Sequence, residues 1–387
     1  MGLNPICRYG SKPGSSMNVL LFGYCHGQGG IQTHTKNLTE GLRERGHKVS
    51  VISPQPMAAH EEVDLCQDVS EYQQSYSSFF ELVRLVRSRH VDVAVVTGTG
   101  WLTMAGALLL PRPCRRVFFE VMSGARNRNF DPRSLVHFGF DAVVGQGSPV
   151  TRRFIDEFGW RDATATIPAL PEPLERRTSI PRQNSRDVSE GVRFAHFGRL
   201  AAHKNVRLLV DRFKDYAPDG STLDIWGEGP DLDLIARSIS QNGLNNHITL
   251  RGRYPDGQAY VELLQSYDLK LLPTVGEEGA PLVLLEAMAC GLPFVANGVG
   301  GIPDYTNPDC VVTDGDIRNF VSAVTTMVHR LQSGNINQSR LQRCYDASFR
   351  FTRLVDRWEG LLMSIVHQVP ELKHTVPGGP TDGPSTV

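Results

Sequence analysis

Two carboxylates eight residues apart stand in the part of the chain best suited to chemistry. The stretch between Glu278 and Glu286 is mostly apolar, with Pro281 near its start and Gly291 shortly after its end. Proline suits the first turn of a helix and glycine suits its end, so we predict a buried helix that carries Glu286. A charged carboxylate inside such a helix is costly unless it is hydrogen-bonded. Hydroxyl groups of a bound ligand would satisfy it, and the alternative is a structural ion pair with a buried arginine.

The turn before the predicted helix suits a phosphate group. Gly279 lies in this turn, and the helix start behind it offers free backbone N–H groups to an anion. A strand at 293–297 and a second glycine turn at 298–304 follow. Helix, strand and glycine turn in this order repeat the layout of a doubly wound nucleotide domain. A carboxylate for hydroxyls beside an amide cradle for phosphate indicates a sugar-nucleotide site.

A pair of cations follows another predicted strand. Gly198–Leu200, with an arginine at its centre, comes directly after the strand at 192–197, and Lys204 stands in the loop before the next helix. At the carboxyl edge of a parallel sheet, arginine suits a diphosphate as a bidentate donor and lysine as a point charge. The alternative is a solvated basic loop. Further on, Arg251–Tyr254 follows a strand, where its backbone either faces a base or forms an ordinary turn.

The alternation of strand and helix patterns predicts two α/β domains, each a parallel sheet covered on both faces. Prolines and polar residues interrupt the alternation between them and predict a linker. The predicted division is a disordered segment 1–16, a first domain 17–170, a linker 171–190, a second domain 191–348, a closing amphipathic helix 349–369 and a disordered tail 370–387. Ligand sites commonly lie between two such domains.

Composition excludes several classes of protein. The net charge of −1 gives no global attraction to nucleic acid. Seven scattered cysteines without a Cys-x-x-Cys pair favour a reducing cytoplasm over a disulfide framework or a zinc site. The apolar run 101–110 is too short to span a bilayer. We therefore expect a cytoplasmic protein without bound metal or cofactor.

One basic segment leaves room for a membrane contact. It places five arginines beside the apolar residues 108–110, an arrangement that suits an anionic surface such as the inner membrane face. A solvated basic loop is the more ordinary alternative. The arginines are Arg112, Arg115, Arg116, Arg126 and Arg128.

A glycine-rich loop joins the first predicted strand and helix. The segment 27–30 lacks the full Gly-x-Gly-x-x-Gly spacing, and no acidic residue ends the second strand. A nicotinamide-dependent dehydrogenase is therefore a poor interpretation. We instead expect that Gly29 and Gly30, which lack side chains, allow the backbone to approach a phosphate or a sugar. His26, in the same loop, is a candidate to face the site between the domains.

Together these residues resemble the retaining glycosyltransferases of family 4, also called glycosyl transferases group 1. The resemblance runs from about residue 17 to about residue 369, and the Glu-x7-Glu motif is its most specific part. It is supported by Gly29-Gly30, Gly198-Arg199-Leu200 with Lys204, Gly227-Glu228-Gly229-Pro230 and Gly300-Gly301-Ile302-Pro303-Asp304. It implies an α/β GT-B fold, in which two Rossmann-like domains with parallel sheets face each other across a cleft.

The resemblance also implies the roles of individual residues. Arg199 and Lys204 would hold the diphosphate, Glu286 the ribose and Glu278 the hydroxyls of the donor sugar, which makes Glu278, Arg199 and Lys204 the implied catalytic residues. Gly29 and Gly30 would approach the phosphates from the acceptor side. The donor-binding residues expected in full are Gly198, Arg199, Lys204, Arg253, Glu278, Gly279, Ala280, Pro281, Leu282 and Glu286.

The chain departs from the family pattern on the acceptor side. The segment 118–124 lacks the histidine that the family often carries near the reacting carbon, so Glu120 or Ser123 is expected to take a polar role there. Asp304 replaces the usual glutamate. We expect a UDP-sugar donor, with GDP-mannose as an alternative, and an unidentified hydroxyl acceptor. Two further alternatives are a catalytically retired subunit that binds a sugar nucleotide and a membrane-surface transferase with a lipid-linked acceptor.

Overall fold

The structure is a computed structural model, and it describes residues 16–24, 29–53, 69–71, 79–97, 100–126, 130–177 and 188–367. The tail predicted to be disordered, 370–387, lies outside these ranges, and so does the predicted N-terminal segment except for Ser16.

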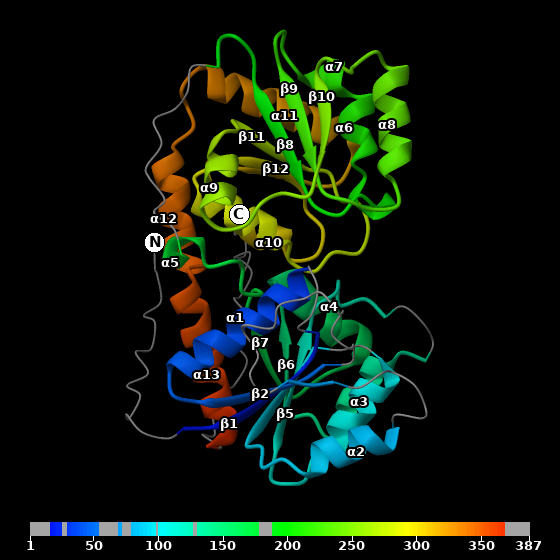
Figure 1. Ribbon diagram of the computed structural model, residues 1–387, viewed down its shortest axis with the longest axis vertical. Coiled ribbons are helices and arrows are strands. Elements are labelled where there is room, and N and C mark those ends of the chain that lie inside the picture. Colours follow the sequence, from blue (N-terminus) through cyan, green and yellow to red (C-terminus); the bar gives the residue numbers. More distant parts are fainter. Residues whose placement is uncertain are drawn as a thin grey trace, which may run out of the picture.

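The first part of the chain forms a seven-stranded parallel sheet in the order β3-β2-β1-β4-β5-β6-β7. Parallel neighbours need long crossover connections, and helices provide them (Figure 1). The strands are β1 (Asn18–Phe22), β2 (Lys48–Ser53), β3 (Val69–Glu71), β4 (Val93–Val96), β5 (Arg115–Glu120), β6 (Ala142–Gly145) and β7 (Ala163–Thr166). The helices are α1 (Gly30–Glu44), α2 (Phe79–Arg87), α3 (Trp101–Leu108), the 3-10 helix η2 (Pro132–Phe138), α4 (Ser148–Phe158) and α5 (Leu174–Arg177).

The second part forms a six-stranded parallel sheet in the order β10-β9-β8-β11-β12-β13. Its strands are β8 (Arg193–Phe197), β9 (Thr222–Trp226), β10 (Ile248–Gly252), β11 (Leu269–Leu272), β12 (Phe294–Asn297) and β13 (Val311–Thr313). Its helices are η3 (Ala202–Lys204), α6 (Arg207–Asp211), α7 (Phe213–Tyr216), α8 (Leu232–Gln241), α9 (Gly257–Gln265), α10 (Leu282–Ala289), η4 (Ile302–Tyr305), α11 (Ile317–Gln332), α12 (Gln338–Ser348) and α13 (Phe351–Val366). The prediction of two parallel sheets is confirmed.

Alternate residues of each strand build separate cores on the two faces of a sheet. In β1, Val19 and Leu21 share a core with α1 and α13, whereas Leu20 and Phe22 share one with α2 and α3. In the second domain, Phe194 of β8 packs with α6, α8 and α11, whereas Phe197 packs with α9 and α10. Side chains alternate across a strand, so strands covered on both faces must be apolar at nearly every position.

Three short elements escaped the sequence analysis. β3 has three residues, and β7 is built from Ala163–Thr166, whose side chains are half-buried at the edge of the sheet. α5 lies inside the predicted linker 171–190. Leu174 anchors it in a core, and the carboxylate of Glu175 accepts hydrogen bonds from the hydroxyl group of Tyr345 at 3.1 Å and from the backbone N–H of Phe351 at 3.0 Å.

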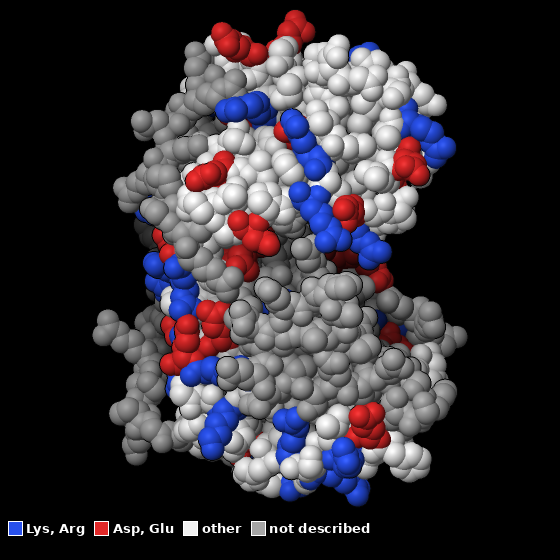
Figure 2. Space-filling view, in the orientation of Figure 1, with Lys and Arg blue, Asp and Glu red and all other residues white. Residues whose placement is uncertain are grey.

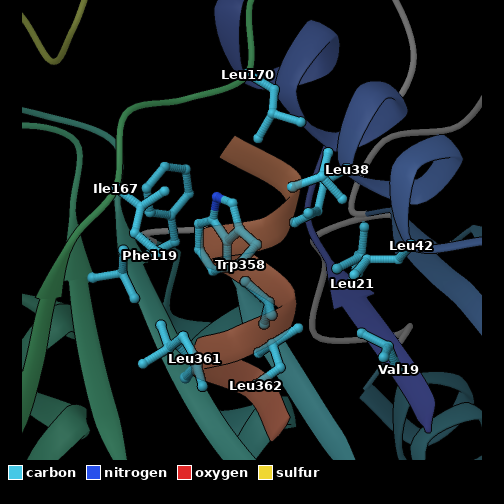
Figure 3. Close-up of a cluster of buried hydrophobic side chains, with 14 of the residues drawn as sticks. Val19, Leu21, Leu38, Leu42, Phe119, Ile167, Leu170, Trp358, Leu361 and Leu362 are labelled. Carbon is cyan, nitrogen blue, oxygen red and sulfur yellow. The ribbon is translucent and has the colours of Figure 1, made fainter. Parts of the chain in front are cut away.

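The last helix, α13, packs on the first domain although it follows the second domain in sequence (Figure 1). Its fully buried Trp358 lies in the middle of a cluster that includes Phe119 and Leu38 (Figure 3). The rings of Trp358 and Phe119 meet edge to face at 5.0 Å. At the surface, Glu359 of α13 accepts from Arg45 and pairs with His47, each at 3.0 Å. The closing helix that we predicted at 349–369 thus completes a core of the first domain.

We predict that Trp358→Ala lowers the free energy of unfolding by about 3–5 kcal/mol, because it leaves a large cavity between α13 and the first sheet. Urea denaturation followed by circular dichroism measures this loss. Trp101→Ala is the control, since Trp101 is 43% exposed and should cost much less. Equal losses in the two variants would contradict a core role for Trp358.

Candidate functional site

Glu286 is buried in α10, with 7% of its surface exposed. The hydroxyl group of Tyr260 donates to its Oε2 at 2.9 Å, and the backbone N–H of Glu172 donates to its Oε1 at 3.4 Å. Burial raises the pKa of Glu286, whereas the charge of Lys270 and the two hydrogen bonds lower it. The groups that interact with Glu286 are thus a tyrosine, a backbone amide and a lysine, and not the buried arginine that a structural ion pair was expected to use. Because a carboxylate offers about four acceptor positions, Glu286 retains capacity for donors from a ligand.

Glu278 and Lys204 form an ion pair that joins two segments of the predicted site. Glu278 lies in the loop before α10, and Lys204 ends η3 after strand β8. The pair is largely enclosed, with side chains that are 14% and 15% exposed, respectively. Chain folding therefore brings together the carboxylate and the ammonium group that the sequence motifs singled out separately.

Arg199, the other predicted donor-site cation, has an exposed side chain. It follows Gly198 directly and precedes Lys204 in the same loop. Within the described residues, no ion pair involves its guanidinium group. Arg253 is also exposed, and its Nε lies 2.8 Å from the carboxylate of Glu228. An ion pair in solvent contributes little to stability, so both arginines are available to a ligand at low cost.

The backbone cradle before α10 is closed by a residue of the first domain. The N–H of Ala280 donates to the side-chain Oε1 of Gln146 at 2.7 Å. A Cβ atom at Gly279 would lie 2.5 Å from the carbonyl oxygen of Val121 and 2.7 Å from the same Gln146 oxygen. The amide that we expected to face a phosphate is therefore occupied by a glutamine, and a ligand there has to displace it.

A second contact joins the domains next to the first. The backbone N–H of Ser148, at the start of α4, donates to Oδ2 of Asp304 at 2.6 Å. Gly147 and Gly301 also approach each other closely, because a Cβ atom at Gly147 would lie 2.5 Å from the Cα atom of Gly301. Asp304 thus has a definite partner in this chain, a helix start on the opposite domain.

Gly29 and Gly30 lie where the two domains meet. Both are exposed at the start of α1, and a Cβ atom at Gly30 would be 3.7 Å from Leu282 of α10. The structure therefore places the first-domain glycine loop against the helix that carries Glu286. His26, the other candidate in this loop, lies outside the described residues.

Glu120 and Ser123, the remaining acceptor-side candidates, serve the first domain instead. Glu120 is fully buried, its Oε2 lies 3.0 Å from the guanidinium of Arg133, and its Oε1 accepts from the N–H of Met122 at 2.7 Å. Burial raises the pKa of Glu120, and Arg133 opposes the shift. Ser123 is nearly buried and accepts from the N–H of Ala125 at 3.4 Å. Both side chains thus contact groups of the first domain, and their role towards the acceptor stays a prediction.

Two features of the site gave no signal in our sequence analysis. Gln146 is a single polar residue between two glycines after β6, and only its contact with Ala280 distinguishes it from an ordinary turn residue. Trp101 and Phe130 stack with ring centroids 5.2 Å apart although they are 43% and 79% exposed. They follow the carboxyl ends of β4 and β5, the edge of the first sheet that is expected to meet the acceptor.

Only part of the basic segment proposed for a membrane contact is exposed in the structure. Arg116 is 3% exposed and donates to backbone carbonyls, including that of Leu110 at 2.6 Å. Arg115 pairs with Asp141 at 2.9 Å, and Arg126 lies over the ring of Phe158 at 4.9 Å. Arg128 lies outside the described residues. Arg115 and Arg116 thus stabilise the fold, whereas Arg112 and Arg126 are exposed, and the membrane contact stays a prediction.

The distribution of charged side chains on the surface agrees with the small net charge of the chain. On the face in Figure 2, acidic and basic side chains of the described residues are interspersed. None of the helices in the described part of the chain is long and apolar enough to cross a membrane.

Within the described ranges, no group of three His, Cys, Asp or Glu side chains is arranged to hold a metal ion. The segment Asp314-Gly315-Asp316 has the spacing of an Asp-x-Asp motif, but Asp316 caps α11 and accepts from the N–H groups of Arg318 at 2.8 Å and Asn319 at 3.3 Å. These carboxylates serve the helix.

Two family models match the chain. Glycosyl transferases group 1 matches residues 191–330, and Glycosyltransferase Family 4 matches residues 28–145. The first covers the domain with the Glu-x7-Glu motif and the second covers the domain with the glycine loop. The chain belongs to this glycosyltransferase family.

Similar curated proteins share parts of the chain. An exopolysaccharide phosphotransferase of Streptomyces coelicolor is 26% identical over 74% of this chain and 30% of its own length. The 2-deoxystreptamine glucosyltransferase of Streptomyces kanamyceticus is 27% identical over 42% of this chain and 41% of its own length. Less than half of each of these two relatives is thus matched. An uncharacterised glycosyltransferase of Haemophilus influenzae is 22% identical over 86% of this chain and 96% of its own length.

Solved structures extend the likeness to both domains. The Anabaena protein HepE in complex with UDP superposes with a TM-score of 0.74 at 17% identity, over 90% of this chain and 100% of that chain. The lipopolysaccharide outer core galactosyltransferase WaaB in its apo form gives a TM-score of 0.69 at 16% identity, over 90% and 99%. At these identities the likeness establishes the fold, and the predicted GT-B architecture is confirmed.

We predict that Glu286→Gln weakens nucleotide-sugar binding by about 1–3 kcal/mol, the value of a hydrogen bond to a charged group. The midpoint of thermal unfolding should change little, because the amide keeps a partner in Tyr260 and because Lys270, whose pKa burial lowers, can lose its proton. Isothermal titration calorimetry and a thermal melt measure the two effects. Glu262→Gln, on the exposed side of α9, is the control. Unchanged affinity with a large loss of stability would make Glu286 a purely structural residue.

Proposed function

We propose that this protein is a retaining glycosyltransferase that transfers a sugar from a nucleotide-diphosphate donor to a hydroxyl group of an acceptor. One observation carries the proposal: the Glu278–Lys204 pair stands directly before α10, the helix that carries Glu286, and the first domain contacts both this loop and Glu286. This arrangement combines acceptors for sugar hydroxyls, a cation for phosphate and a helix start, which are the groups that a sugar nucleotide requires.

The residues divide between the parts of the donor. Glu286 accepts hydrogen bonds from the ribose, and Glu278 accepts them from the transferred sugar. Lys204 and Arg199 stabilise the negative charge that grows on the departing diphosphate. In the unliganded chain Lys204 neutralises Glu278. When a diphosphate enters, it shares the ammonium group and leaves the Glu278 carboxylate free to accept from sugar hydroxyls.

A UDP-sugar is the donor that we favour. Solved structures of HepE, a protein of the same fold, hold UDP or UDP-glucose. GDP-mannose is the alternative, because a GDP-mannose-dependent mannosyltransferase of Mycobacterium tuberculosis is 27% identical over 46% of this chain. We propose the cytoplasm as the location, because four described cysteines are free thiols, as expected in a reducing compartment.

The transfer needs no strong protein base under this proposal. The bond from the anomeric carbon to the phosphate oxygen breaks, and the new bond to the acceptor oxygen forms on the same face of the sugar. The departing phosphate oxygen takes the acceptor proton. This route suits a chain in which Glu120 is committed to Arg133 and no histidine stands in the segment 118–124.

A second function, a sugar-nucleotide-binding subunit without transferase activity, rests on the same missing histidine. Binding of the donor without hydrolysis or transfer to any acceptor would favour it. Slow hydrolysis of the donor in the absence of acceptor, lost in the Lys204 variant, would favour the enzyme.

We predict that Arg199→Ala and Lys204→Ala each lower turnover by roughly two orders of magnitude, the usual effect of removing one group that stabilises transition-state charge. Initial rates of nucleotide release at saturating donor measure this. Arg237→Ala, which changes an exposed arginine of α8 outside the predicted site, should keep the parent rate. Near-parent rates in both site variants would remove the diphosphate from this loop.

We further predict that the product keeps the anomeric configuration of the donor and that activity persists in excess EDTA. Cationic side chains and backbone amides replace a metal ion in this proposal. Proton NMR of fresh product gives the anomeric coupling constant. An inverted anomer, or activity that EDTA abolishes and magnesium restores, would contradict the mechanism.

A further inference from the structure

The second domain contains a lysine where its fold calls for an apolar side chain. Lys270 lies on β11, in the sequence Leu269–Leu272, and it is fully buried. Strands alternate between the faces of a sheet, and the neighbouring strands present Phe197 and Phe294 to the core beneath α9 and α10. Lysine is almost never fully buried without a partner. A specific function of its charge would account for this position.

The ammonium group of Lys270 is directed to the helix that carries Glu286. Its Nζ donates to the carbonyl oxygen of Val283 at 2.6 Å and lies 4.8 Å from the centroid of the Phe197 ring. Val283 is three residues before Glu286, so the two lie on one side of α10. The two charges interact through the protein: Lys270 lowers the pKa of Glu286, and Glu286 raises that of Lys270.

We infer that Lys270 is a positioning residue for the nucleotide sugar, whose buried ammonium group keeps Glu286 ionised so that the carboxylate accepts hydrogen bonds from the ribose hydroxyls. This inference rests on the donor role proposed for Glu286. It assigns Lys270 no contact with the ligand, because its side chain is enclosed by protein.

The other titratable groups around the pair cannot replace this charge. They are His196 of β8, Tyr254 and Asp256 before α9, Tyr260 of α9, Cys290 of α10, Glu175 of α5 and Tyr345 of α12. Burial lowers the pKa of His196 to about 3, so that it is neutral at physiological pH. The tyrosine, cysteine and carboxyl groups are neutral or negative. Lys270 is therefore the one cation of this set.

Burial lowers the pKa of Lys270 to about 7 and raises the pKa of Glu286, and the charge of each group opposes the shift of the other. In the inferred pair, Lys270 carries the proton that Glu286 gives up, so ionisation of Glu286 releases none to solvent. Without Lys270, the raised pKa leaves Glu286 protonated, and ribose binding must release that proton. Affinity should then rise with pH, by up to tenfold per unit, until the carboxyl group is ionised in the free protein.

The test compares two variants that remove the charge in different ways. Lys270→Met replaces the side chain by an apolar one of similar length, a change that buried charges often tolerate. Lys270→Gln keeps a donor for the carbonyl of Val283. The probe is UDP-glucose or GDP-mannose, whichever the parent protein binds, because neither has a phosphate that titrates near neutrality. Calorimetry over a pH series from about 5.5 to about 7.5, in two buffers of different ionisation enthalpy, gives affinity and proton release.

We expect both variants to bind about tenfold or more weakly than the parent at the acidic end, to recover with rising pH and to release a proton on binding. The parent should show much less pH dependence below pH ~7. Adding Glu286→Gln to either variant should abolish the pH dependence. A pH-independent loss in both variants, or parent-like binding by Lys270→Gln, would overturn the inference. Failure of the parent to bind either probe would instead count against the proposed function.

Discussion

A carboxylate inside an apolar helix sets the conditions for the rest of the second domain. α10 is buried along almost its whole length, and only 7% of the surface of Glu286 is exposed. A charge at such a position needs hydrogen-bond donors and a counter-charge within the protein. Tyr260 and the amide of Glu172 supply the donors, and Lys270 supplies the charge. The segment before α5 and the surroundings of α9 and β11 are thereby tied to one side chain.

The same site requires glycine residues where its loops meet, because a side chain would not fit there. A Cβ atom at Gly300, whose φ is +57°, would lie 2.0 Å from the carbonyl oxygen of Glu278, and one at Gly279 would collide with Val121 across the domain junction. Only glycine allows these approaches. Because Ala280 also donates to Gln146, the loop that is proposed to hold phosphate is at present part of the contact between the domains. Occupation of the donor site and the relative position of the domains are therefore coupled.

The sequence was sufficient for features that follow from local rules and insufficient for those that depend on tertiary contacts. Periodicity and glycine turns predicted both parallel sheets, and the apolar residues around Glu286 predicted that it lies in a buried helix. Nothing local showed that Glu120 would pair with Arg133, 13 residues away, or that Arg116 would donate to backbone carbonyl groups such as that of Leu110. Gln146 and Lys270 were missed for the same reason, since a lone polar residue acquires meaning only from what packs against it.

The position of α13 has a consequence for the order in which the protein can mature on the ribosome. One core of the first sheet includes Phe351, Trp358 and Leu362, which are among the last described residues to be synthesised. Until they emerge, the face of β1 and β5 around Leu21 and Phe119 is covered only in part, by α1 and the segment after β7, although these strands were made much earlier. Domains usually fold as they leave the ribosome. Here the first domain completes this core only after α13 has been made, and until then its apolar face is a natural client for a chaperone.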